Sequence, residues 1–261
     1  MSERLKSVSY PLVAFVALIV FWDVAIRVLK IPNFILPTPE SVLDALNRGY
    51  VEGHFWQHFL FTSQSMLLGY VFGCSAAFAL GCLFAESRAV ERTLLPFVVA
   101  LQSMPKVALA PLIIVWFGFG IESKIVMVAL VCFFPMFINT VVGLKQTSPA
   151  LLDLMTAFSA SRWSVLLRIK IPSAAGHIFA GLQIAIVLGL IGAVVAEFVS
   201  STKGLGHLIN AAAVNLETNV MFAALISLAV LGVGGSQLMR YLHAKIVFWD
   251  KGSSTEQVAT E

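Results

Sequence analysis

Two charged side chains stand inside or at the end of long apolar stretches, and they are the first candidates for chemistry. Lys106 interrupts one apolar run, and Glu197 closes another. Gln102 and Ser103 precede the lysine, and Asn139 lies in a third run. A lone ammonium or carboxylate that leaves water is costly unless it has a partner or a wet cavity. These five residues are therefore predicted either to line a polar path or to hold helices together.

The usual signatures of catalysis are missing from the sequence. There is no G-x-x-x-x-G-K-[ST] run, so the chain does not bind ATP through a P-loop. His54 and His58 have a spacing that suits metals, but no third ligand accompanies them, and the three cysteines lack metal-ligand spacing. Ser236, after Gly235, is the one tempting nucleophile for an intramembrane serine protease, and no histidine stands at matching depth. We predict no catalytic residue, no metal and no cofactor bound by this chain.

The composition excludes most soluble proteins. The chain has 261 residues, of which 59% are apolar and 12% are charged. Soluble domains are roughly 45–50% apolar and about 25% charged. A soluble domain of this length has too little interior for so much apolar surface. The sequence therefore predicts an all-α integral membrane protein and excludes a disordered chain or a nucleic-acid-binding domain.

About six apolar runs are long enough to cross a membrane, which takes roughly 20 residues. They are residues 7–29, 53–85, 93–121, 125–144, 171–196 and 218–239. The first run could instead be a cleaved signal peptide, because its start is basic. Its length, and the absence of an A-x-A-like site before Pro32, favour a retained span.

The positions of lysine and arginine predict the orientation. With the N-terminus inside, the cytoplasmic side holds eleven of these residues and the outer side five, Lys124 among them. Cytoplasmic loops normally carry the excess of positive charge. Both termini are therefore expected in the cytoplasm. The expected organisation is a tail over residues 1–8, a transmembrane domain over 9–249 with a core of about 57–245, and a disordered tail over 250–261.

Several loops carry helix signals. In the longest cytoplasmic loop, Ser148 and Pro149 predict a helix to about Phe158, and a second helix can start at Ser161. A plain connecting loop is the alternative. Thr38 followed by proline predicts a short amphipathic helix at the outer interface. The outer segment 203–217 can re-enter the membrane edge.

Other patterns concern helix packing. Pro105 and Pro111 remove backbone donors and predict a break in the third span. Asp23 and Arg27 are four residues apart and predict a local ion pair. Small residues recur every four positions in the second and fifth spans, which lets helices approach closely. Packing within the bundle, a dimer interface and a moving contact remain open for these rows, which are Gly69, Gly73, Ala77 and Gly81, and Gly181, Ala185, Gly189 and Ala193.

The cytoplasmic loop and its neighbours resemble a known family. The stretch Leu151–Pro172 resembles the EAA loop of permease subunits of bacterial ATP-binding-cassette importers. Five further stretches are similar to the nitrate/sulfonate/taurine branch of the binding-protein-dependent inner-membrane components, and they occur in the same order. These are Ile35–Glu40, Met104–Gly118, Phe133–Thr140, Ala196–Phe198 and Gly204–Gly206.

The resemblance implies a type I importer permease fold, in which the EAA loop is a coupling helix that docks on a cytoplasmic ATPase. We call residues 146–172 the coupling loop. The implied partners are a second permease copy, two ATPase subunits that bind ATP and Mg²⁺, and an extracytoplasmic substrate-binding protein. The implied substrates are nitrate, sulfonates, taurine or vitamin precursors such as pyrimidines and flavins. The residues implied to contact the ATPase are Asp153, Ala157, Ser159, Ala160, Ser161, Arg162 and Trp163.

The coupling loop departs from the family pattern at a few positions. Leu154 and Met155 stand where small residues are usual, and Ser159 stands where glycine is usual. We expect Ser159 to be tolerated if its backbone stays out of the left-handed region, which only glycine visits freely. A self-sufficient secondary transporter or channel is the alternative function, although it would have no use for a coupling loop.

Overall fold

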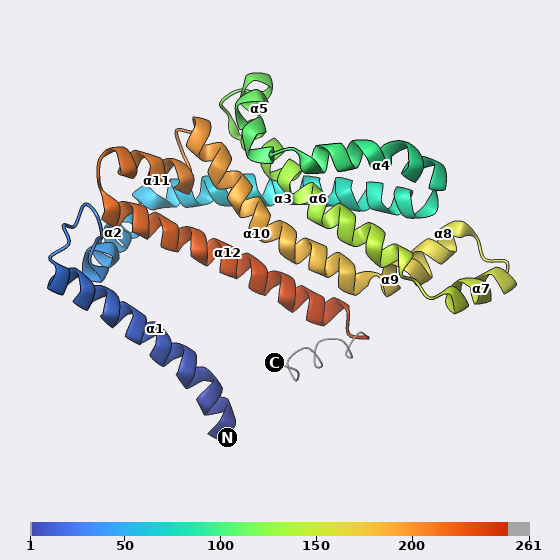
Figure 1. The fold of residues 1–261 in the computed structure, drawn as a ribbon, viewed down its shortest axis with the longest axis horizontal. Coiled ribbons are helices and arrows are strands. Elements are labelled where there is room, and N and C mark those ends of the chain that lie inside the picture. The colour runs from blue at the N-terminus through green and yellow to red at the C-terminus, as the bar shows by residue number, and fades with distance from the viewer. Residues whose placement is uncertain (1, 250–261) are drawn as a thin grey trace. The chain divides into compact units, whose positions relative to one another are not determined.

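The computed structural model describes residues 2–249, which form helices joined by short loops (Figure 1). The tail expected over residues 250–261 lies outside the described residues, and the boundary expected at residue 8 falls inside the first helix. The helices are α1 (Ser2–Leu29), α2 (Pro39–Val51), α3 (His54–Glu86), α4 (Arg88–Ser103), the 3-10 turn η1 (Lys106–Leu109), α5 (Ala110–Phe117), α6 (Ile121–Lys145), α7 (Pro149–Ala157), α8 (Arg162–Val165), the π-helical turn η2 (Leu166–Lys170), α9 (Ile171–Ser173), α10 (Ala175–Ser200), α11 (Leu205–Val214) and α12 (Thr218–Ile246).

Within residues 2–249, four helices are long and apolar enough to cross a membrane, namely α3, α6, α10 and α12. A fifth candidate span is α4 together with η1 and α5, which are bent by 89° relative to each other. The bend confirms the break expected in the third span. Helix α1 covers the first expected span, and its crossing of the membrane stays a prediction. The ion pair expected on α1 is present, because Arg27 Nε lies 2.7 Å from Asp23 Oδ2.

The helices belong to two compact units. The first consists of residues 2–62 and 202–229, and the second of residues 63–201 and 230–249. The apolar core of the first unit contains Val42, Ala45, Phe55 and Ala223. Helix α2 begins where expected, because the Thr38 hydroxyl accepts a hydrogen bond from the Ser41 N–H at 3.3 Å. The helix signal of threonine followed by proline is thus confirmed.

Helix α11 is held within the first unit by side chains of α3. The Leu205 N–H donates to the Thr62 hydroxyl at 2.8 Å, and the Gly204 N–H lies 3.1 Å from His58 Nδ1. Gly204 has a φ of +108°, which glycine adopts without strain. The expected re-entrant segment is therefore a short apolar helix whose first backbone donors are capped by polar side chains.

In the second unit, the small-residue row of α3 packs against α6. A Cβ on Gly73 would lie 2.4 Å from the carbonyl oxygen of Ala129, and a Cβ on Gly69 would lie 2.5 Å from Val128 Cβ. Ala77 is fully buried. Such close approach of two backbones is possible only where the side chain is a hydrogen atom or a methyl group. The row therefore serves packing within the bundle.

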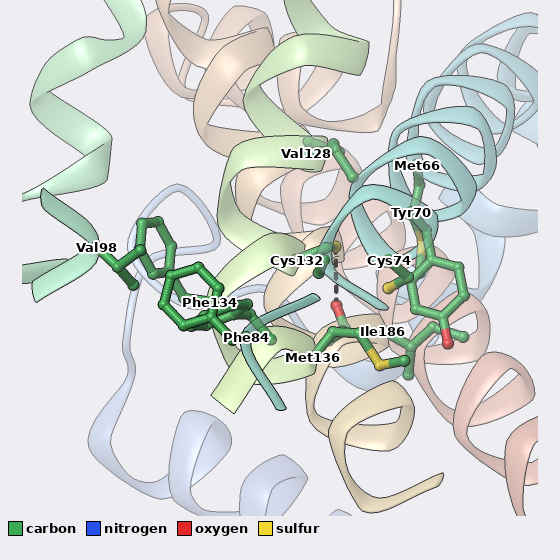
Figure 2. Packing of buried hydrophobic residues seen from close by; sticks show 14 residues of the cluster. Met66, Tyr70, Cys74, Phe84, Val98, Val128, Cys132, Phe134, Met136 and Ile186 are labelled. Carbon is green, nitrogen blue, oxygen red and sulfur yellow. Dashed lines mark hydrogen bonds between the residues drawn. The ribbon is translucent and has the colours of Figure 1, made fainter. Parts of the chain in front are cut away.

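The small-residue row of α10 packs against the same helix. A Cβ on Gly189 would lie 2.7 Å from Cys132 Sγ, and one on Gly181 would lie 2.9 Å from Asn139 Cβ. Figure 2 shows the Cys132 thiol, which donates a hydrogen bond to the carbonyl oxygen of Ala185 at 3.2 Å. Helices α3 and α10 therefore both pack closely against α6. The interpretation of both rows as packing within the bundle is confirmed.

Candidate translocation cavity and coupling loop

A break in the backbone opens a cavity in the second unit. Helix α4 ends at Ser103, and the extended backbone of Met104 and Pro105 turns the chain into η1 and α5. Pro105 has no N–H to continue a helix, which explains why the break falls here. The cavity beside the break has a volume of about 400 Å³. It is lined by Gln102, Lys106, Val107, Met127, Val131, Phe134, Pro135, Ile138, Leu188, Ile191, Gly192 and Val195.

Lys106 provides the cationic group of this cavity. Its Nζ donates a hydrogen bond to the carbonyl oxygen of Gln102 at 3.2 Å. The same nitrogen lies 4.6 Å from the centre of the Phe134 ring, a distance at which the ring face attracts a cation. The two predicted residues Gln102 and Lys106 are thus brought together in one cavity. The remaining walls are almost entirely apolar.

The other predicted path residues lie elsewhere. Ser103 is not among the cavity-lining residues, and its hydroxyl donates to the Val99 carbonyl oxygen at 2.9 Å. The Asn139 amide donates to the Pro135 carbonyl oxygen at 2.8 Å and so bonds to its own helix. Glu197 is buried near the end of α10 that is remote from the coupling loop, and it interacts electrostatically with Lys124.

The coupling loop is a helix-turn-helix at one end of α6 and α10 (Figure 1). Helix α7 begins with Pro149 after Ser148, and α8 begins after Ser161, whose hydroxyl accepts from the Ser164 N–H at 3.3 Å. Ser148 stands at the N-cap position of α7, but its side chain makes no capping hydrogen bond, and its backbone carbonyl accepts from the Leu151 N–H at 3.1 Å. The two helices expected from these signals are therefore both present.

The turn between α7 and α8 corrects one expectation. Ser159 has a φ of +50° and so lies in the left-handed region, which means that the condition under which we expected serine to be tolerated here is not met. The Ser159 N–H donates to the Thr156 carbonyl at 2.9 Å, and the Ala160 N–H donates to the Met155 carbonyl at 3.0 Å. These two hydrogen bonds form a Schellman motif, in which the position of Ser159 is usually glycine. The hydrogen bonds that end α7 therefore require a left-handed backbone conformation at position 159, whichever side chain stands there.

Apolar side chains of the coupling loop face outward. Phe158 is 73% exposed and Trp163 is 72% exposed, and α7 has no buried residue. Arg162, Ser161 and the other predicted contact residues of this loop are at most partly buried. Exposed aromatic side chains beside an arginine are typical of a surface that another protein covers. The loop therefore presents an exposed apolar and basic surface.

One ion pair and one hydrogen bond join the coupling loop to other parts of the chain, and a second ion pair lies just before it. Lys170 Nζ lies 2.5 Å from Glu86 Oε1, which joins the end of η2 to the end of α3. Lys145 pairs with Glu91 and so joins the end of α6 to α4. The Trp249 indole N–H donates to the Pro172 carbonyl oxygen at 3.3 Å. These contacts join the region of the loop to α3, to α4 and to the segment that follows α12.

Sequence reasoning missed the burial of Lys124, which we counted among the outer charges. The residue is fully buried in the first turn of α6. One signal could have revealed it, because Lys124 stands between Gly118-Phe119-Gly120 and a charge-free run of twenty residues. Among residues 2–249, no group of three or more His, Cys, Asp and Glu side chains is placed to hold a metal ion.

A bundle of long apolar helices with a cavity beside the break in α4 and an exposed helical loop is the architecture expected of a membrane permease. The comparisons agree with this class. The chain is 37% identical to the riboflavin transport system permease protein RibX of Chloroflexus aurantiacus, over 91% of this chain and 89% of that protein. It is 30% identical to the formylaminopyrimidine transport permease protein ThiX of Halalkalibacterium halodurans, over 92% and 96%.

The family model named "Binding-protein-dependent transport system inner membrane component" matches residues 69–248, and the chain belongs to this family. A solved structure of the MetNI methionine ABC transporter has the same fold, with a TM-score of 0.65, 18% identity, and coverage of 76% of this chain and 98% of that one. The type I importer fold is therefore confirmed. The chain is a permease subunit of a binding-protein-dependent importer and not itself an enzyme.

Proposed function

We propose that this chain carries a small solute across the bacterial inner membrane as one of two permease copies, driven by two cytoplasmic ATPases. The observation that carries this proposal is the exposed coupling loop fastened by the Lys170–Glu86 ion pair. A channel or a secondary transporter gains nothing from such a rigid projection. An extracytoplasmic binding protein delivers the solute, ATP and Mg²⁺ bind to the partner ATPase, and both termini lie in the cytoplasm.

The coupling surface consists of the outward side of α7, the turn at Ser159 and the start of α8. Trp163 and Phe158 supply apolar area, and Arg162 supplies a charge that is free to meet a carboxylate. A rigid helix that binds one conformation of the ATPase more tightly than another transmits nucleotide-driven closure to α6 and α10. The residues proposed to contact the ATPase are Asp153, Ala157, Ser159, Ala160, Ser161, Arg162 and Trp163.

The translocation path runs through the cavity that contains Lys106 and Gln102. Its apolar walls, with one ammonium over an aromatic ring, favour a small organic molecule with a polar or anionic group. Relatives of the chain are named for transport of riboflavin, formylaminopyrimidine, aliphatic sulfonates and taurine. Ser103, Asn139 and Glu197 stay secondary candidates for the path, although none of the three lines this cavity.

Purification from the native host tests the proposal. The tagged chain is extracted in mild detergent, and the proteins that accompany it are identified by mass spectrometry. We expect a P-loop ATPase in equal amount, and ligand screening of the accompanying binding protein then names the solute. Repeated recovery of the intact chain alone would favour a secondary transporter.

Substitutions in the loop test the docking surface. We expect Arg162→Glu and Ser159→Trp to abolish uptake while the protein still inserts, because each disrupts the surface that meets the ATPase. Arg92→Glu, on an exposed part of α4, is the charge-matched control, and Ser159→Gly is the control for the turn. Normal uptake by both loop variants would disprove the assignment of the coupling surface.

A further inference from the structure

The buried Lys124 ammonium is held by two separate parts of the chain. Its Nζ donates hydrogen bonds to the carbonyl oxygens of Ser200 at 2.7 Å and Phe119 at 2.9 Å. The hydroxyl oxygens of Ser123 and Ser200 each lie 3.4 Å away. The Glu197 carboxylate, which is 1% exposed, adds an opposite charge. The three donors of the ammonium therefore have carbonyl and hydroxyl acceptors in place of water.

These partners place Lys124 at a junction of three segments. The lysine lies in the first turn of α6, and Ser200 is the last residue of α10. Phe119 lies in the turn from α5 to α6, where Gly118 has a φ of +79°. The last carbonyl groups of a helix have no partner within the helix and attract a cation. One side chain thus ties the end of α10 to the turn that precedes α6.

The junction stands at one end of the candidate cavity. Met127, one turn along α6 from Lys124, lines the cavity, as does Val195 near the end of α10. The coupling loop joins the opposite ends of the same two helices. The cavity therefore lies between the loop on one side and the Lys124 junction on the other.

We propose that Lys124 is a positioning residue that holds the end of the cavity remote from the coupling loop closed, and releases Ser200 and Phe119 when that end opens. This inference rests on the proposed transport function. The bonds of a buried ammonium are strong while water is excluded, and they are replaced by hydration once water enters. Such a contact favours one of two states and so sets how often the unloaded transporter opens.

Accessibility of an introduced cysteine tests this role. Val195→Cys is labelled with a membrane-impermeant maleimide in intact cells and in inverted vesicles, with the parent chain as background. We expect Lys124→Met to raise the labelling rate in intact cells about tenfold, as when a buried charge that stabilises one state is removed. The rate in inverted vesicles stays unchanged, because the opposite end of the cavity is unaffected. General loosening of the fold would raise both rates.

Two further variants keep the test decisive. Lys30→Met, in a loop of the first unit, removes an exposed lysine that is far from the junction in sequence and is expected to label at the parental rate. Glu197→Gln keeps the hydrogen bonds of Lys124 and is expected to raise the labelling rate in intact cells by less than Lys124→Met does. If Lys124→Met does not accumulate in the membrane, the labelling of Glu197→Gln alone tests the inference. Parental labelling of the recoverable variants would overturn the inference. The labelling needs no ATPase. A failure of the proposed function would therefore be recognised in a different measurement, as the absence of ATP-driven uptake by the unmodified chain.

Discussion

The Lys170 ammonium lies 2.5 Å from the Glu86 carboxylate, and this pair joins the coupling loop to the end of α3 across 84 residues of sequence. The Lys170 side chain is 16% exposed and that of Glu86 is 25% exposed, so water screens the pair only in part. The loop therefore has a stiff electrostatic link to a long span in addition to its covalent connections. The pair therefore holds the end of the coupling loop beside the end of α3.

Removal of this link should weaken coupling more than folding. We expect Glu86→Gln to lower ATP-driven uptake about three- to tenfold, which corresponds to a loss of about 0.7–1.4 kcal/mol for a partly exposed pair. ATP hydrolysis by the purified complex should persist. The exchanged pair Glu86→Lys with Lys170→Glu should recover much of the uptake, and failure of Glu86→Gln to change uptake would show that the pair is dispensable.

The left-handed residue in the coupling loop makes a stability prediction. Ser159→Gly should stabilise the loop by about 0.5–1 kcal/mol, because glycine adopts the φ of +50° without the steric cost of a side chain. Ser159→Val should destabilise it, because a β-branched residue suffers most in this region. Resistance of the loop to limited proteolysis measures both effects, and equal resistance of the three proteins would contradict the prediction.

The close approach of α3 and α6 predicts that Gly73 does not tolerate a methyl group. Gly73→Ala places a Cβ 2.4 Å from a backbone oxygen of Ala129, and overpacking of this kind costs about 1–3 kcal/mol. The matched control is Gly234→Ala on α12, where a Cβ meets no atom within 4 Å. Thermal unfolding in detergent should separate the two variants by several degrees, with the control unchanged or slightly more stable.

The position of Lys106 makes a prediction on selectivity. Lys106→Gln removes the charge in the cavity and should lower uptake of the solute about ten- to a hundredfold if that solute carries an anionic group, because a hydrogen-bonded charge pair contributes about 1.5–3 kcal/mol. The matched control is Lys30→Gln, in a loop of the first unit. Unchanged uptake and selectivity would remove Lys106 from the substrate path.

Some of this architecture was predictable because its causes are local in sequence. The apolar composition alone requires a lipid bilayer, and the length of each apolar run shows which runs can cross it. The break at Pro105 was predicted from the N–H that proline lacks, although Pro96 and Pro135 lie inside the continuous helices α4 and α6. Thr38 and Ser161 act on donors only three residues away, so their helix starts could be inferred without knowledge of the rest of the fold.

Other features depend on contacts between distant segments, which only the tertiary structure decided. Lys124 is an outer charge in the sequence, but the end of α10, 76 residues later, supplies the carbonyl oxygen that allows its burial. Local sequence likewise could not show which helices the small-residue rows contact, because the same four-residue spacing suits a dimer interface and packing within one bundle. The left-handed backbone of Ser159 could not be inferred from the sequence either, since closing the end of α7 with hydrogen bonds outweighs the steric cost at one residue. What the sequence determined was the long apolar helices and several of the helix starts; the burial of charge and the choice of packing faces required the folded bundle, because both are set by neighbours remote in sequence.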